Sequence, residues 1–258
     1  MWFELQTMIV VSILFAGMLL CIEVGRRIGL ARTAVDPESA HKGISAVEGA
    51  VFAILGLLIA FTFSGAASRF EARRLLIGQE ANAIGTAYLR LAALPESAHS
   101  ELRSLFSQYV DLRIAMYHDV EDRDGMRQRS EQQSKLQNAI WNRAVTASSQ
   151  PGASAAAPMI VLPALNEMID ITTTREVANR NHPPTIIFLM LGGLSLLSAL
   201  LVGYSMSCRG RSWLHILSYG LLISLTILVI LDLEYPRRGL IRIDAADRVL
   251  VELRQMMK

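Results

Sequence analysis

Residues 60–79 read AFTFSGAASRFEARRLLIGQ, and this stretch decides the fold. It begins with apolar and small residues and ends with charged ones, among them Arg69, Arg73 and Arg74. No proline interrupts it, and its early glycine, Gly65, is tolerated inside a helix. We therefore expect one helix that leaves a membrane and continues without a break into water.

The hydrophobic residues, 52% of a chain of 258, concentrate in four long apolar blocks. A spanning helix needs roughly 20 mostly apolar residues to cross about 30 Å of hydrocarbon, and each block meets this requirement. The first block is expected to be retained as a span, because no positively charged segment precedes it as in a cleaved signal. We expect membrane-spanning helices at residues 5–24, 49–67, 184–208 and 212–231.

The expected spans pair into two hairpins, residues 1–68 and 183–231. Residues 69–182 between them have the composition of a soluble protein, and residues 232–258 form a C-terminal tail. This organisation describes an integral membrane protein in a lipid bilayer, with one soluble insert on the same side as both termini.

The insert is predicted to be helical. We expect helices at residues 64–94, 96–118, 126–147 and 159–180, with a flexible Ser/Gly/Ala/Pro link at 148–158. Apolar residues recur at helical spacing in the last three of these segments. They are Leu102, Leu105, Phe106, Tyr109, Leu112 and Met116; then Leu136, Ile140 and Ala144; then Leu162, Leu165, Met168 and Ile169. No strand-like alternation is convincing, so the predicted fold class is all-α.

Residues that carry chemistry do not gather into a catalytic, cofactor-binding or metal-ligating motif. The five histidines are scattered singly, the two cysteines lie in or beside apolar blocks, and the net charge of +2 is too small for a nucleic-acid binder. The acidic run at residues 119–125 lacks the spacing of a calcium loop, and Asn166, Glu167 and Asp170 fit a polar helix face. The spans contain almost no ionisable residues, which argues against a charge-relay transporter. A passive pore or a membrane-anchored interaction module remains, and an enzyme is not expected.

Basic residues leave the membrane orientation open. The first helix alone places the hairpin loops inside, because its N-terminal tail has no Lys or Arg. The total count favours the opposite orientation, with nine arginines on the insert side and six basic residues on the loop side. The first set is Arg69, Arg73, Arg74, Arg175, Arg180, Arg237, Arg238, Arg242 and Arg248, and the second is Arg26, Arg27, Arg32, Lys42, Arg209 and Arg211.

The opening stretch resembles the second membrane helix of bacterial bestrophins. That helix carries Leu-Gly, an apolar run, Ala-Phe, small residues, Arg-aromatic and then Ala/Gly-Arg-x-Leu-x-Gly. The corresponding residues here are Leu55-Gly56, Ala60-Phe61, Ala66-Ala67, Arg69-Phe70, Ala72-Arg73, Leu75 or Leu76, and Gly78. LDLEYPRRG at 231–239 resembles the proline-containing segment that follows the last bestrophin helix. The phrase PALNEMID at 163–170 is also typical of the bestrophin-like family of bacterial and plant membrane proteins.

This resemblance implies a pentameric ion channel in the bacterial inner membrane, with the insert and both termini in the cytoplasm. It also implies that the second span lines the conduction path. Ile54, Leu57, Leu58 and Phe61 share one helix face at i, i+3, i+4 and i+7, so they are the expected hydrophobic neck. Phe61 matches the aromatic of the bestrophin Ala-Phe pair, which favours this face over the one through Phe52, Ile59 and Phe63. The alternative is that the face packs against spans one and three.

The arginines at the end of this span have two interpretations. Arg69, Arg73 and Arg74 either line an anion-attracting vestibule or act as interfacial anchors and ion pairs with Glu71 or Glu80. At two points the chain departs from bestrophins. Thr62 stands where they usually have arginine, and Arg237 and Arg238 replace the acidic string that binds calcium in animal bestrophins. We therefore expect no calcium gating.

A second function remains open from the sequence. The chain also fits a non-conducting membrane scaffold or sensor whose helical insert binds a partner protein.

Overall fold

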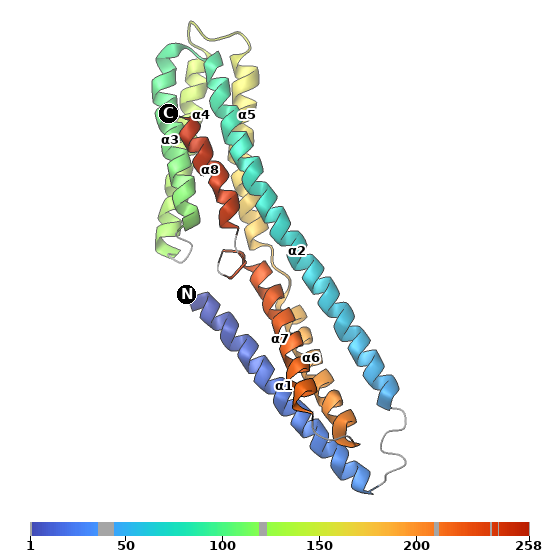
Figure 1. Cartoon of the computed structure of the whole chain (residues 1–258). Helices are drawn as coiled ribbons and strands as arrows, with labels where there is room; N and C mark the ends of the chain where they lie inside the picture. The colour runs from blue at the N-terminus through green and yellow to red at the C-terminus, as the bar shows by residue number, and fades with distance from the viewer. Residues whose placement is uncertain are drawn as a thin grey trace. The chain divides into compact units, whose positions relative to one another are not determined.

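The structure is a computed structural model that describes residues 2–35, 44–118, 123–208, 212–237, 239–241 and 243–257. These residues form α-helices and two short 3-10 helices and contain no strand, which confirms the all-α prediction. The elements are α1 Trp2–Val35, α2 Ile44–Arg90, η1 Leu91–Ala93, α3 Glu96–His118, α4 Arg123–Ser148, α5 Ala157–Arg180, α6 Thr185–Ser205, η2 Met206–Cys208, α7 Trp213–Glu234 and α8 Asp244–Met256 (Figure 1). The chain forms two compact units, Met1–Phe70 with His182–Ile241 and Glu71–Asn181 with Arg242–Lys258.

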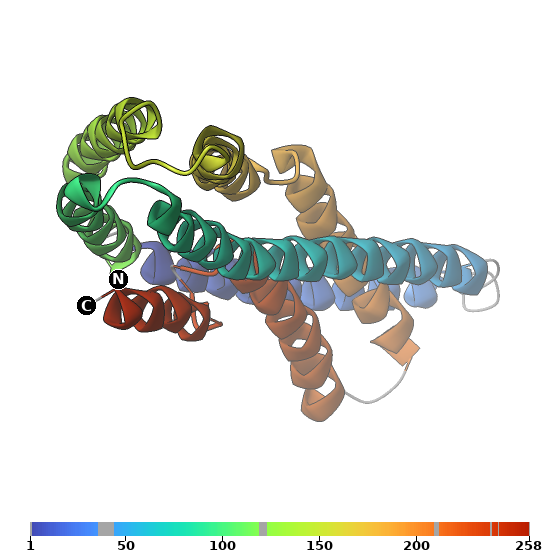
Figure 2. The ribbon, with the colours of Figure 1, turned by 90° about the horizontal axis from the view of Figure 1, so that it is seen from above.

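Helix α2 is unbroken over 47 residues, as the opening stretch predicts (Figure 2). It contains no proline, and its glycines at 49, 56, 65, 78 and 85 do not interrupt it. It ends shortly before Pro95, because the residue that precedes a proline is disfavoured in the α conformation. Leu94 accordingly has extended backbone with ψ of 162°.

Among the described residues, four helical stretches are long and apolar enough to cross a membrane: Leu5–Ala34, Ala46–Ala93, Ala157–Ser205 and Trp213–Glu234. The four predicted spans fall in α1, α2, α6 with η2, and α7. Helices α1 and α2 run well beyond their predicted spans, because a helix does not stop where its sequence turns polar unless a breaking residue comes next.

In the first unit, α1 packs against α6 and α7. The largest fully buried side chains there are Met18 and Ile22 from α1, Leu191 from α6 and Ile230 from α7. Glycines let α1 and α6 approach closely, as small residues do between membrane helices. A methyl group on Gly203 would overlap the backbone carbonyl of Ile22, and one on Gly25 would overlap that of Leu200.

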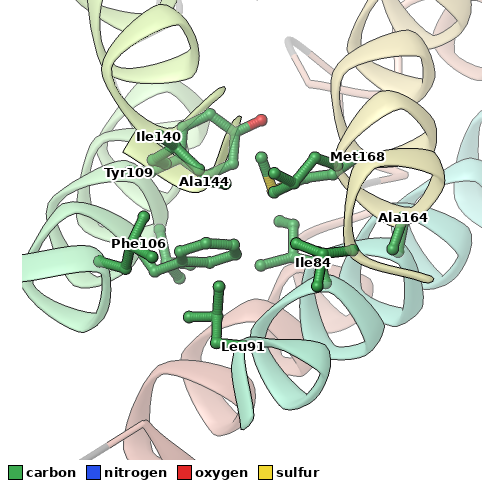
Figure 3. Close-up of a cluster of buried hydrophobic side chains, with 14 of the residues drawn as sticks. Ile84, Leu91, Phe106, Tyr109, Ile140, Ala144, Ala164 and Met168 are labelled. Carbon is green, nitrogen blue, oxygen red and sulfur yellow. The ribbon is translucent and has the colours of Figure 1, made fainter. Parts of the chain in front are cut away.

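In the second unit, α3, α4, α5 and α8 pack with the later turns of α2 around an apolar core (Figure 3). Its labelled side chains point toward one another from five elements: Ile84 (α2), Leu91 (η1), Phe106 and Tyr109 (α3), Ile140 and Ala144 (α4), and Ala164 and Met168 (α5). The predicted apolar faces are confirmed, since every residue of the three predicted stripes is either buried or packed against this core. Burial raises the pKa of the Tyr109 phenol, although the charge of Arg113 and a hydrogen bond from Gln137 oppose the shift.

One ionic cluster is buried inside the second unit. Glu80 of α2 has no exposed surface and binds Arg113 of α3, with Nε 2.5 Å from Oε1, and Arg175 of α5. Both arginines are about 5% exposed. Arg113 also donates from Nη1 to Oε1 of Gln133 at 2.6 Å. A single carboxylate therefore joins three helices.

Two parts of this unit differ from the sequence-based expectations. The link at 148–158 is held in place, because Ser154 donates its backbone N–H to the carbonyl of Ala93 at 2.9 Å and Ala157 is fully buried. The tail contains α8, whose Leu250, Leu253 and Met257 are buried at helical spacing, and whose Arg254 binds Asp111 at 2.8 Å. Of the acidic run at 119–125, residues 119–122 lie outside the described residues.

The close α1–α6 crossing predicts a large effect at Gly203. Gly203→Ala should lower the free energy of unfolding by about 1–3 kcal/mol, because the added methyl group overpacks the contact with Ile22. Thermal unfolding in detergent, followed by helical circular dichroism, measures this change.

Gly193→Ala in the same helix is the matched control. Nothing lies within 4 Å of a Cβ at Gly193. The control should be neutral or stabilising by up to about 1 kcal/mol, since alanine favours a helix more than glycine does. Equal destabilisation by Gly203→Ala and Gly193→Ala would contradict the close approach of α1 and α6 at Gly203.

Candidate functional site

The predicted neck face lies on the first half of α2. Ile54, Leu57 and Phe61 expose 54%, 57% and 69% of their surface in the single chain. Leu58, the fourth predicted residue, is half-buried and packs against the core of the first unit. Three of the four side chains thus point away from the core of the first unit, and Leu58 lies at the edge of that face.

A neighbouring side of α2, next to Leu58, belongs to the core of the first unit. Leu55 is 3% exposed and Ala66 is fully buried. Thr62, where bestrophins usually have arginine, is also buried and donates its hydroxyl to the carbonyl of Leu58 at 2.6 Å. Its side chain is therefore satisfied within the helix and carries no charge.

The rival face through Phe52, Ile59 and Phe63 is divided between core and surface. The Phe52 ring packs edge-on against Tyr219 of α7 with centroids 6.5 Å apart. Ile59 packs against the core of the first unit, whereas Phe63 is 43% exposed. This face is less available than the one through Leu57 and Phe61.

Arg69 is fixed by a buried carboxylate. Its Nε and Nη2 lie 2.9 and 2.8 Å from Oε2 of Glu234, which has no exposed side-chain surface. Nδ1 of His182 lies 2.9 Å from Oε1 of the same glutamate, and the His182 ring stacks on Tyr235 with centroids 4.7 Å apart. Glu234 thus connects the end of the α2 span to the end of α7 and to the segment before α6.

Arg73 and Arg74 lie in the second unit and differ from each other. Arg73 is 3% exposed and donates to the carbonyls of Ala178 and Asn181 at 3.1 and 3.0 Å, at the C-terminal end of α5. The last carbonyls of a helix lack partners within it, so Arg73 caps α5. Arg74 is exposed and lies 3.4 Å from Glu71. Glu80, the other expected partner, binds Arg113 and Arg175.

The C-terminal end of α7 contains residues that sequence reasoning did not select as site residues. Asp232 is 6% exposed and accepts the backbone N–H groups of Leu240 and Ile241 at 2.8 and 2.6 Å. A methyl group on Gly239 would overlap its carboxylate, so the turn requires glycine there. Asp232 and Glu234 stand at the end of an apolar run and within the phrase LDLEYPRRG, and these were the signals in the sequence. Arg238 and Arg242 lie outside the described residues.

Side chains that could ligate a metal do not come together in the described part of the chain. No group of three or more His, Cys, Asp or Glu side chains among these residues is placed to hold a metal ion.

Comparison with known proteins connects this arrangement to a family. A family model described as Bestrophin-like domain matches residues 10–247, which confirms the resemblance drawn from the α2 motif. A point mutant of a bacterial bestrophin homologue from Klebsiella pneumoniae has a similar crystal structure, with a TM-score of 0.68 at 17% identity over 94% of this chain and 98% of that one. A zinc-phased structure of such a homologue gives 0.64 at 16% identity over 92% and 97%. No curated protein matches the chain.

The buried ion pair between Arg69 and Glu234 predicts that Arg69 contributes far more to stability than Arg74 does. Arg69→Gln should cost about 3–5 kcal/mol of unfolding free energy, because it leaves the charge of Glu234 buried with less compensation. Arg74→Gln should change stability by about 0.5 kcal/mol or less, since its pair with Glu71 is exposed to solvent.

Thermal unfolding of both variants in detergent measures the difference. The double change Arg69→Gln with Glu234→Gln should recover part of the loss, since it removes the buried charge together with its partner. If Arg69→Gln proved as stable as Arg74→Gln, Glu234 would not depend on Arg69.

Proposed function

The chain belongs to the bestrophin-like family, and from that premise we propose that it assembles as a homo-oligomeric ring, a pentamer, that conducts small ions along its axis. The observation that carries the proposal is the exposed apolar face of α2 at Ile54, Leu57 and Phe61. A neighbouring stripe of the same helix, at Leu55, Thr62 and Ala66, is buried within the chain, whereas this face is exposed and can meet symmetry-related copies.

Ring assembly supplies what one subunit lacks. Four packed helices enclose no water path, whereas copies around an axis place the same α2 face toward a common centre. Repeated side chains of Ile54, Leu57, Leu58 and Phe61 then form stacked apolar rings. Such constrictions gate ion flow by losing their water.

The bonding of the acidic residues after α7 supports a channel that calcium does not gate. Calcium takes six to eight oxygen ligands. The carboxylate of Glu234 binds Arg69 and His182, and that of Asp232 accepts two backbone N–H groups. These oxygens hold the end of α7 together, and Arg237 adds positive charge beside them.

A cytoplasmic insert, in the inner membrane of a bacterium, is part of the proposal. It rests on the bestrophin-like resemblance and on the larger number of arginines on the insert side. Lys42, Arg209, Arg211, Arg238 and Arg242, which enter that count, lie outside the described residues.

A non-conducting scaffold or sensor remains the second candidate. Apolar side chains on the second unit favour it, since Leu89, Met159 and Met256 expose 74%, 80% and 73% of their surface. A partner protein would cover them. Ion flux through purified protein in liposomes separates the candidates, because a scaffold conducts nothing.

If the side chains of Leu57 and Phe61 form a neck, ion flux should rise when they are shortened. Replacing Leu57 and Phe61 with alanine should widen the apolar rings and increase chloride or potassium flux in liposomes, with the ring intact by native mass spectrometry. Leu55→Ala is the control on the buried side of α2 and should cost about 2–5 kcal/mol of stability without raising flux. Lower stability with unchanged flux in the Leu57/Phe61 variant, or a strictly monomeric mass of the unmodified protein, would refute the neck.

Orientation is checked with one introduced cysteine. Ser154 is exposed in the second unit, and Cys21 and Cys208 are replaced first. A Ser154→Cys variant should stay unlabelled by an impermeant maleimide in intact cells and react after the cells are opened. Ready labelling of intact cells would place the insert outside and show that the first helix sets the topology.

A further inference from the structure

The second unit contains a polar cavity that the channel proposal does not use. Its volume is about 420 Å³, within the range of sites for small molecules. Side chains of α3, α4 and α5 line it, and the charged ones are Arg113, Arg127, Arg175, Arg180, Glu131 and Glu176.

Positive charge is in excess around this cavity. Four lining arginines face two lining glutamates, and Glu80 behind Arg113 and Arg175 adds a third carboxylate. Arg113 and Arg175 are both about 5% exposed. At such poorly solvated positions a charge attracts an anion more strongly than it does in water. The balance of formal charge around the cavity is therefore +1.

The two arginines at the rim are held only loosely. Arg127 pairs with Glu131 at 3.5 Å and Arg180 with Glu176 at 2.5 Å, and all four side chains are more than half exposed. Ion pairs this exposed contribute little energy. Arg127 and Arg180 can therefore turn toward a ligand at small cost.

The remaining lining suits an organic ion. Ser130 and Asn179 supply a hydroxyl and an amide group, and Met116 and Met126 supply flexible apolar surface. The planar guanidinium of arginine matches a carboxylate with two parallel hydrogen bonds. From this combination we propose that the cavity binds a small organic acid with one or two carboxylates.

Binding is tested on the full-length protein in detergent, with radiolabelled succinate as the probe in equilibrium dialysis. Unmodified protein should bind it saturably in the millimolar range or tighter. The variant Arg127→Gln with Arg180→Gln should bind about 10-fold more weakly or worse, because both rim donors are lost. Neutral succinamide should not compete with succinate.

Arg74→Gln with Arg103→Gln is the matched control. It removes two exposed arginines from the same unit outside the cavity and should leave affinity unchanged. Circular dichroism verifies that all variants are folded. Absence of saturable succinate binding, equal losses in both variants, or competition by inorganic phosphate alone would overturn the proposal. The assay needs neither a ring nor flux, so its result stands apart from the channel proposal.

Discussion

Buried carboxylates fix how α2 sits in each of the two units. Within the second unit Glu80 of α2 receives Arg113 and Arg175, and within the first unit Arg69 of α2 reaches Glu234. An isolated charge without solvent is expensive to bury, so each carboxylate needs its cations in good geometry. Rotating α2 by one residue would break these pairs. The face of α2 that carries Leu57 and Phe61 is thereby held away from the core of its own subunit.

Local patterns predicted most of the helices and little of the bonding. The apolar stripes of α3, α4 and α5 are visible because a buried helix face repeats every three to four residues. The pair Arg69–Glu234 joins positions 165 residues apart, and no local period encodes such a contact. Helix α8 was missed for a different reason. Its buried Leu250, Leu253 and Met257 do repeat at helical spacing, but the mixed charges around them are equally typical of a solvated tail.

The three arginines show the same limit on a smaller scale. The sequence places Arg69, Arg73 and Arg74 together at the end of the second span, and all three lie on α2. Their partners differ completely: a buried glutamate, the carbonyls at the end of α5, and an exposed glutamate one turn away. The sequence predicts that such charges cluster. Tertiary packing decides which of them are buried and bonded to other helices and which remain exposed to solvent.

Exposure alone does not distinguish a pore face from a lipid face, because α1 also exposes Ile13 and Leu20. On α2, however, the exposed face changes its polarity along the helix. The face through Leu57 and Phe61 continues to Ser64 and then Ser68, both exposed, near the end of the apolar segment. A hydroxyl group that faces hydrocarbon can bond only within its own helix, as that of Thr62 does, whereas one that faces a wet path can bond water as well. Ser64 and Ser68 suit a path that widens and becomes wet beside an apolar ring, and this change of polarity along one face favours the pore.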